Sequence, residues 1–216
     1  NKKNPINKTM ISKFLINGYR TLFKENQTFF EKVKFLEPGH SMIVERGTIK
    51  RKYNYWKPKP FKTVLSLAEL IQESKRRLVE SLKIRTRSDV PVAFCLSGGV
   101  DSAALVSIAS KILNLKFKTF SIIDSDDRYN ELDNINATVK DTKCENEIIE
   151  LNKKNFLKNL KKLVDYHQSP VSTISYYIHS LISKKASKQG FKVIISGTGA
   201  DELFTGYYDH FLYQLA

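Results

Sequence analysis

The chain has 216 residues, and its 36 basic residues against 22 acidic ones give a formal net charge of +14. This length accommodates one sizeable domain and a smaller part, and two cysteines, Cys95 and Cys144, are too few for a disulfide framework or a zinc site. No apolar stretch approaches the roughly 20 residues that span a bilayer, so we expect no membrane partner. The lysines are scattered over many segments, which favours a solvated basic exterior over a nucleic-acid site.

A helix is predicted between residues 64 and 84. Apolar side chains recur there at helical spacing, and Ser66 stands where an N-cap belongs. The polar segment that ends at Pro91 then breaks the chain. The apolar run at residues 92–96 that follows predicts the first strand of a new unit.

The motif Ser97-Gly98-Gly99-Val100-Asp101-Ser102 follows this strand and precedes an apolar helix start at Ala103. A strand, a glycine turn and a helix N-terminus form an anion site, because the glycines let backbone N–H groups approach the ligand and the helix dipole favours negative charge. The two serine hydroxyls would add donors. An aspartate suits a phosphate site only if it holds a cation such as Mg²⁺. The motif therefore predicts binding of metal-bound phosphate rather than an empty turn, and it lacks the lysine of a Walker loop.

Strands and helices alternate through the rest of the chain. We expect strands at 117–123, 145–151 and 191–195 and helices at 132–142, 156–166 and 174–187, the last helix ending at Gly190. This order predicts an α/β fold with a doubly wound, mainly parallel sheet. Ligands of such sheets bind beyond the carboxyl ends of the strands, so the loops after Leu96, Ile122 and Ile195 would together form one site.

A second motif, S-G-T-G-A-D-E-L-F-T-G-Y at residues 196–207, follows the strand predicted at 191–195. It resembles the SGEGADELFGGY stretch of the glutamine-hydrolysing asparagine synthetases. The first motif resembles the pyrophosphate loop of the ATP pyrophosphatase superfamily, to which these enzymes belong. Relatives that make GMP, NAD or tRNA lysidine do not carry the second string, so the pair of motifs identifies this chain as similar to the asparagine synthetases.

The resemblance implies an adenine nucleotide alpha hydrolase-like fold and an ATP-dependent ligase. Such an enzyme uses ATP and Mg²⁺ to convert a carboxylate, such as that of aspartate, into an acyl-adenylate. Ammonia from glutamine then displaces AMP, so that asparagine, glutamate, AMP and pyrophosphate are formed. It further implies a cytoplasmic protein that can associate as a homodimer.

The resemblance also implies roles for single residues. The residues expected to contact ATP and pyrophosphate are Leu96, Ser97, Gly98, Gly99, Asp101, Ser102, Ile122, Ser196 and Gly197. Asp101 and Asp201 are the candidate metal ligands, and both are candidate catalytic residues together with Glu202. Glu202 would ligate a second ion, orient ammonia or accept its proton. The alternative for the acidic pair at 201–202 is a helix start that favours acids because of its dipole.

Residues 1–56 resemble the end of a glutaminase domain of the N-terminal nucleophile type. The segments at 17–19 and 36–40 match it, and residues 42–47 and 50–53 look like its last hairpin, so we expect antiparallel strands and a helix. Residues 57–216 would be the synthetase domain, cut short at its C-terminus. No cysteine stands at position 1, so we expect this chain, as a fragment, to lack glutaminase activity.

Three residues depart from the family pattern. Thr198 replaces a glutamate close to the reacting groups, Thr205 replaces a glycine, which we interpret as a helix-start substitution, and Asn130 replaces the aspartate of a Tyr-Asp-Glu element. Thr198 favours another carboxylate, such as that of a surface sugar or a secondary metabolite, over free aspartate. The alternatives are a nucleotide-binding module without catalysis and a basic nucleic-acid-binding protein, which salt-sensitive retention of RNA would reveal.

Overall fold

The structure is a computed structural model that describes residues 4–22, 25–59, 64–124, 126, 130–151 and 154–215. It divides into two compact units, one formed by residues 1–64 with 164–174 and the other by residues 65–163 with 175–216. Both sequence motifs belong to the second unit. Within the described ranges, no helix combines the length and the apolar character needed to cross a membrane.

The first unit contains helix α1 (Lys8–Asn17), the 3₁₀ turn η1 (Gly18–Thr21) and a hairpin of β1 (His40–Glu45) and β2 (Thr48–Asn54). The two strands pair antiparallel, and the turn between them places Arg46 and Gly47 at φ +49° and +77°. Positive φ at both central residues matches the twist of two-residue hairpins. The expected hairpin and helix are thus present, whereas their origin in a glutaminase domain stays a prediction.

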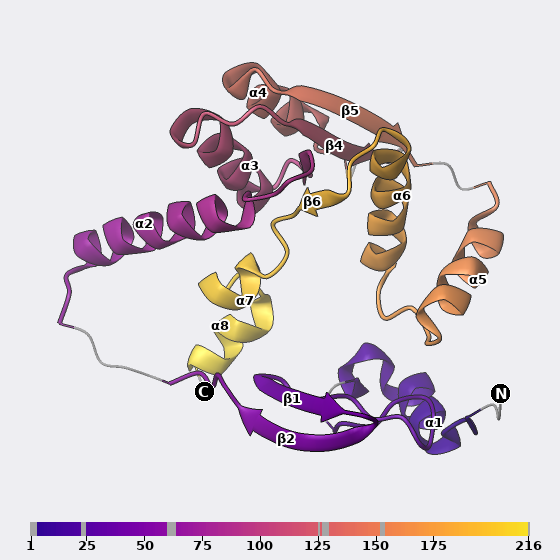
Figure 1. The fold of residues 1–216 in the computed structure, drawn as a ribbon. Helices are drawn as coiled ribbons and strands as arrows, with labels where there is room; N and C mark the ends of the chain where they lie inside the picture. Colours follow the sequence, from indigo (N-terminus) through magenta and orange to yellow (C-terminus); the bar gives the residue numbers. More distant parts are fainter. Residues whose placement is uncertain are drawn as a thin grey trace. The chain divides into compact units, whose positions relative to one another are not determined.

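The second unit is built on a four-stranded parallel sheet (Figure 1). Its strands are β3 (Val92–Cys95), β4 (Lys118–Ile123), β5 (Glu145–Glu150) and β6 (Val193–Ile195), in the order β5-β4-β3-β6. The chain moves outward from β3 to β5 and then returns to the other side of β3. The direction of winding therefore reverses between β3 and β6, which confirms the predicted parallel α/β sheet and makes the β3–β6 junction its switch point.

Helices cover both faces of this sheet. One face packs against α2 (Leu67–Arg85), α3 (Val100–Ser107) and α4 (Leu132–Thr142), and the other packs against α6 (Ile174–Lys188). Neighbouring residues of β3 serve opposite faces, since Phe94 belongs to the first cluster and Ala93 to the second. The remaining elements are the π-helical turn η2 (Ile108–Ile112), α5 (Phe156–His167), α7 (Ala200–Phe204) and α8 (Tyr208–Leu215).

The predicted helix signals are present in the structure. At the start of α2, the Ser66 hydroxyl accepts the Glu69 N–H at 3.4 Å and the Glu69 carboxylate accepts the Ser66 N–H at 2.8 Å, a complete capping box. After α6, Gly190 has φ +88°, and Phe191 donates its N–H to the carbonyl of Ala186 at 3.1 Å. Because this bond belongs to the helix end, β6 begins at Val193 rather than at Phe191 as predicted.

Two buried hydroxyls connect the middle of the sheet to its edge. Thr119 and Ser121 of β4 are fully buried, and both donate to the side-chain oxygen of Asn146 on β5, at 2.8 and 3.1 Å. Buried polar groups lower stability unless they find partners, so these bonds let polar side chains occupy the sheet interior. They also tie the register of β5 to that of β4, in which Thr119 stands opposite Asn146.

Candidate functional site

The first motif forms a closed loop between β3 and α3. Helix α3 starts at Val100, with Gly99 as its N-cap, three residues before the predicted start at Ala103. Ser102 is 5% exposed, and its hydroxyl accepts the N–H of Ser97 at 3.1 Å and donates to the carbonyl of Gly99 at 3.0 Å. The Ser102 hydroxyl thus holds the loop shut instead of pointing out as a free donor.

The N-terminus of α3 is arranged to receive an anion. No side chain of the described residues caps this helix, so its first-turn N–H groups are not occupied by a side-chain acceptor. Gly98 has φ +92°, which lets the backbone turn sharply in front of the helix. Uncapped N–H groups and the positive end of the helix dipole together favour a phosphate at this position.

The second motif packs directly against the first. A Cβ built on Gly197 would lie 3.0 Å from the Cβ of Asp101 and 3.1 Å from the backbone N of Ser102. Gly197 is therefore a glycine because the two motifs touch at that point. Since the motifs follow β3 and β6, their contact lies at the switch point of the sheet, where open parallel sheets bind ligands.

The segment that precedes α4 also reaches the first motif. A Cβ on Gly98 would lie 2.5 Å from the Cβ of Glu131 and 2.9 Å from its carbonyl oxygen. Glu131 is the N-cap residue of α4, and its side chain makes no capping hydrogen bond. The structure thus brings together the three loops that the sequence analysis expected at one site, and the roles of their residues in binding remain predictions.

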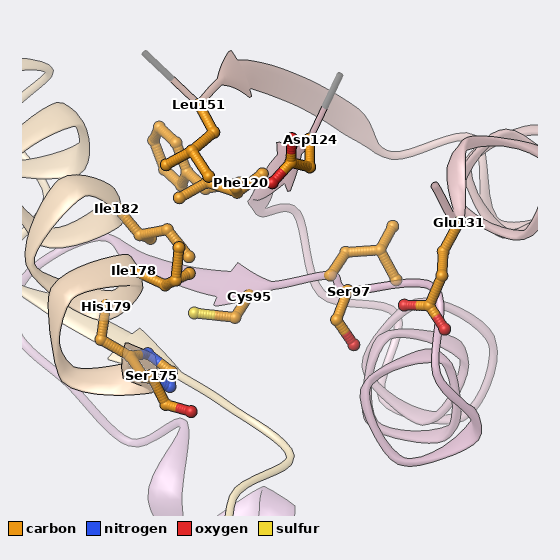
Figure 2. A pocket seen from close by; sticks show the side chains of 12 residues that line it. Cys95, Ser97, Phe120, Asp124, Glu131, Leu151, Ser175, Ile178, His179 and Ile182 are labelled. Atoms are coloured by element: carbon orange, nitrogen blue, oxygen red, sulfur yellow. The ribbon is translucent and has the colours of Figure 1, made fainter. Parts of the chain in front are cut away.

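A cavity of about 300 Å³ opens beside the first motif, between the carboxyl ends of the strands and α6 (Figure 2). It is lined by Cys95, Leu96, Ser97, Phe120, Ile122, Asp124, Glu131, Leu151, Ser175, Ile178, His179 and Ile182. Leu96, Ser97 and Ile122 are predicted nucleotide contacts, and they are brought together here. The other predicted residues lie outside its lining: Gly98, Gly99, Asp101, Ser102, Ser196, Gly197, Asp201 and Glu202.

Helix α6 supplies the wall of this cavity that the sequence analysis missed. Ser175, Ile178 and His179 come from α6, and Figure 2 shows the Cys95 thiol directed toward that helix. Burial raises the pKa of the Cys95 thiol to about 11, because desolvation disfavours the thiolate. The thiol is therefore protonated at neutral pH and serves as a wall of the cavity rather than as a nucleophile.

The acidic candidates lie in the first turns of two helices, Asp101 in α3 and Asp201 in α7. Among the described residues, no group of three or more His, Cys, Asp or Glu side chains gathers where it could hold a metal ion. Mg²⁺ in nucleotide sites is commonly held by one or two carboxylates together with phosphate oxygens and water. The donor set therefore fits an ion that arrives with phosphates better than a permanently bound one.

The departures from the family pattern have distinct surroundings. Thr198 is exposed, and its hydroxyl accepts a hydrogen bond from the Ser196 hydroxyl at 2.9 Å. Ser196 is a predicted ATP contact, so its hydroxyl proton is used within the loop. Glu202 is also exposed and accepts the hydroxyl proton of Tyr207 at 2.9 Å. Thr198 and Glu202 are both exposed, so neither side chain is held in place by burial in the core.

Thr205 corrects one interpretation. It is not a helix-start residue, because it follows the last residue of α7 and adopts φ +58°. A left-handed backbone is strained for a β-branched side chain and unstrained for glycine, which explains a glycine at this position in the family pattern. The Thr205 hydroxyl donates to the carbonyl of Phe204 at 2.7 Å and satisfies part of the helix end.

Comparison with known proteins matches residues 73–215 to the family model described as asparagine synthase. The protein "Putative asparagine synthetase (glutamine-hydrolyzing) 2" of Methanocaldococcus jannaschii is 31% identical over 212 residues, which cover 97% of this chain and 40% of that relative. Asparagine synthetase (glutamine-hydrolyzing) 1 of Bacillus subtilis is 33% identical over 185 residues, 85% of this chain and 29% of the relative.

A third relative has a different name. Amidase chyE of Penicillium rubens is 26% identical over 201 residues, which cover 85% of this chain and 30% of the relative. The chain thus spans 40% or less of the length of each of these three proteins.

Proposed function

The chain belongs to the asparagine synthase family, and from this membership we propose that it carries the nucleotide site of an ATP-dependent amide-forming ligase. The observation that supports this most is the contact of Gly197 with Asp101 and Ser102, which joins the two family motifs at the switch point of the sheet. In the proposed reaction, the carboxylate of the substrate is activated as an acyl-adenylate and ammonia displaces AMP.

The first motif would bind the leaving pyrophosphate. When the carboxylate attacks the α-phosphorus, negative charge moves onto the β- and γ-phosphates, and the uncapped N–H groups of α3 with the positive end of its dipole stabilise that charge. Asp101 and Asp201 would hold Mg²⁺, which offsets phosphate charge when bound. The buried hydroxyl of Ser102 would keep the N–H groups aimed at the phosphates because it fixes the loop from inside.

The cavity of about 300 Å³ would hold the adenosine. Its volume is at the lower end for small-molecule sites, and its walls are mostly apolar with a few polar groups, the usual composition of such sites. Leu96 is 1% exposed, so it would contact the nucleoside through its backbone, whereas Ile122 is only partly buried. Ser196 and Gly197 would contact the nucleotide from the other side of the switch point.

The second half of the reaction needs a nitrogen nucleophile. We propose that ammonia comes from glutamine, that Glu202 orients it or accepts its proton, and that the protein acts in the cytoplasm as a homodimer. Glu202 is exposed, and its Oε1 accepts the hydrogen bond from the Tyr207 hydroxyl, so its carboxylate can be reached by an incoming amine. The amidated carboxylate would be that of aspartate.

A different carboxylate is the second candidate. Thr198 has an exposed hydroxyl bonded to Ser196 where the family pattern has an acidic group, so the charge near the reacting atoms differs. The similarity to Amidase chyE shows that relatives of this chain include a protein not named as an asparagine synthetase. A sugar acid or the carboxylate of a secondary metabolite would then replace aspartate.

The test is carboxylate-dependent ATP–pyrophosphate exchange by the protein that contains this chain. We expect exchange with aspartate, loss of exchange by at least a hundredfold in Asp101→Asn and Asp201→Asn, and retention in Asp133→Asn. Asp133 is a suitable control because it is an exposed acid in the first turn of α4 and does not line the cavity. Exchange with a sugar acid but not with aspartate would select the second candidate, and Mg-ATP binding without exchange for any carboxylate would contradict both.

A further inference from the structure

The positive charge of the chain is concentrated in one of its two units. Residues 1–64, which form most of the first unit, contain 15 basic and 4 acidic residues, whereas residues 65–216 contain 21 basic and 18 acidic ones. We expected lysines scattered over a solvated exterior, but 11 of the 14 net positive charges belong to residues 1–64. An excess of one sign on one part of a protein is typical of a surface that binds a polyanion.

The β1–β2 hairpin of this unit exposes part of that charge (Figure 1). Every residue of β2 is exposed, and so are the residues that follow it up to position 59. Five cations stand within this stretch: Lys50, Arg51, Lys52, Lys57 and Lys59. Lys52 forms an ion pair with Glu37, which offsets one of the five charges. Residues 48–59 therefore form an exposed basic strip.

Aromatic side chains stand between these cations. Tyr55 is 66% exposed and Trp56 is 62% exposed, although both rings carry apolar area that burial would favour. The guanidinium of Arg51 lies 4.5 Å from the centroid of the Tyr53 ring, so a cation and an aromatic ring meet on one face of β2. Proteins that bind single-stranded nucleic acids combine these two features, because bases stack on aromatic rings while cations bind the phosphates.

A groove lies on the opposite face of the hairpin. It has a volume of about 550 Å³ and is lined by Pro38, His40, Asn54, Trp56, Lys57 and Pro58. His40 and Asn54 stand opposite each other in the β1–β2 register and so share a face, which is not the face of Tyr53 because side chains alternate along a strand. No acidic side chain is among these described lining residues. The groove thus joins an exposed indole to a cation.

The backbone fixes the wall of the groove that carries Trp56. Tyr55 and Trp56 both donate their N–H groups to the carbonyl of Gly39, at 2.8 and 3.2 Å. Gly39 has φ +70°, and a Cβ at this position would collide with the Trp56 carbonyl oxygen, so only glycine permits this approach. A wall that is held by the backbone needs little ordering when a ligand binds, which lowers the entropic cost of binding.

From these observations, and independently of the proposed ATP site, we propose that the β1–β2 hairpin binds single-stranded nucleic acid. One base stacks on the Trp56 indole in the groove, and the adjoining phosphates bind Lys57 and Lys59. Every base offers an aromatic face, so the binding tolerates differences of sequence, whereas a duplex keeps its bases stacked on one another and offers none to Trp56. A polyanion without bases would match the charge but not the indole.

Fluorescence anisotropy of a labelled oligouridylate of about 12 nucleotides, titrated with the 216-residue chain, tests this inference. We expect binding that weakens steeply as salt is added. Trp56→Ala should weaken binding about tenfold, the effect of one lost stack, and Trp56→Phe should keep most of the affinity. Lys57→Gln should lower the slope of log K against log[salt] by about 0.7, the contribution of one phosphate contact.

Two control variants remove the same groups from the second unit. Lys75→Gln removes an exposed cation of α2, and Tyr213→Ala removes a ring of α8 that is 81% exposed. Both variants should bind the oligonucleotide as the unchanged chain does. If a hairpin variant and its control lost equal affinity, net charge or any exposed ring would account for the binding, and the inference would fail.

The nature of the ligand gives further outcomes that would overturn the inference. Equal affinity for duplex RNA or for heparin would do so, because neither presents an unstacked base. Absence of binding at low salt by a chain whose circular dichroism shows it to be folded would do so as well. Displacement of the oligonucleotide by Mg-ATP would assign the strand to the nucleotide site instead of the hairpin. Failure of the chain to bind Mg-ATP, by contrast, would contradict the proposed function and leave the hairpin site standing.

Discussion

The two motif loops follow the same plan of strand, glycine turn and helix, yet they are stabilised in different ways. The loop after β3 is closed by the buried Ser102 and leads into an eight-residue helix whose Val106 is fully buried. The loop after β6 leads into a five-residue helix without a buried residue, and its Leu203 is 78% exposed. The first loop is thus fixed by its own bonds and the core.

The second loop is positioned mainly by its contact with the first. Gly197 lies against Asp101 and Ser102, and the turn at Gly199 and the end of α7 at Thr205 both adopt positive φ. Disturbing the first loop should therefore damage both loops, while disturbing the second should leave the first intact. The loop after β6 thus depends on the loop after β3, but not the reverse, and four substitutions test this.

The largest effect is expected for Gly98→Ala. The new Cβ would lie 2.5 Å from the Cβ of Glu131, and the alanine backbone would have to keep the unfavourable φ of +92°. We therefore expect a loss of roughly 3 kcal/mol in the free energy of unfolding and no measurable Mg-ATP binding. Urea unfolding and calorimetry measure the two effects. Gly190→Ala is the matched control, because its φ is +88° with nothing within 4 Å, and it should cost only about 1 kcal/mol. Equal costs at both positions would show that the contact with Glu131 is unimportant.

Ser102→Ala should have the next largest effect. It leaves the N–H of Ser97 and the carbonyl of Gly99 without their partner inside the loop, which should lower the free energy of unfolding by about 1–3 kcal/mol and weaken Mg-ATP binding. Ser97→Ala serves for comparison: it removes the contact of the Ser97 hydroxyl with the Ser102 hydroxyl and its bond from the Gly99 N–H, but Ser97 is exposed, so water can replace that hydroxyl. If the two variants lost equal stability in urea unfolding, burial of Ser102 would not be what fixes the loop.

Gly206→Ala tests the second loop without touching the first. Its Cβ would lie 1.8 Å from Oδ1 of Asp201, so the carboxylate must turn away, while the backbone needs no positive φ at this position. We expect less than about 1 kcal/mol of lost stability because the side chain is flexible and only partly buried, but about tenfold weaker binding of Mg-ATP. Titrations at several Mg²⁺ concentrations measure this, and an unchanged dependence on Mg²⁺ would remove Asp201 as a candidate ligand.

Thr205→Gly should have the smallest effect, and it should be stabilising. Glycine relieves a left-handed backbone that costs an L-residue about 1–2 kcal/mol, but it loses roughly 0.5–1 kcal/mol of chain entropy on folding. The net gain is therefore between zero and about 1.5 kcal/mol, visible as a small rise in Tm. A lower Tm would mean that the hydrogen bond from the Thr205 hydroxyl to Phe204 outweighs the strain.

The sequence predicted those elements whose signals are local. Helix α4 has the bounds 132–142 that were expected, because the apolar periodicity that predicts it lies within the helix itself. Errors occurred where one residue serves two elements. The Phe191 N–H belongs to the end of α6, which shortened β6, and the N-cap at Gly99 moved the start of α3 to Val100. A pair of glycines predicts a turn but does not fix the residue at which the following helix begins.

The candidate site was predictable in part. The motifs placed Ser97 and Gly197 in loops that the structure brings together, because strand order fixes where the carboxyl ends of parallel strands meet. The wall from α6 was not predictable, since nothing local shows that Ser175 and His179 face the cavity. Cys95 could have been found, because strand alternation places it opposite the face of Phe94.

The bonds from Thr119 and Ser121 to Asn146 have a consequence for the evolution of this protein. A slip of β5 by one residue would bring Glu145 or Glu147 to the position of Asn146 and turn every side chain of that strand to the opposite face. Because the alignment of the two strands is secured in the interior, it does not depend on the side chains that line the cavity beyond the end of β4. New substrate preferences can thus arise by substitutions at positions such as 124 and 131, at little cost in fold stability.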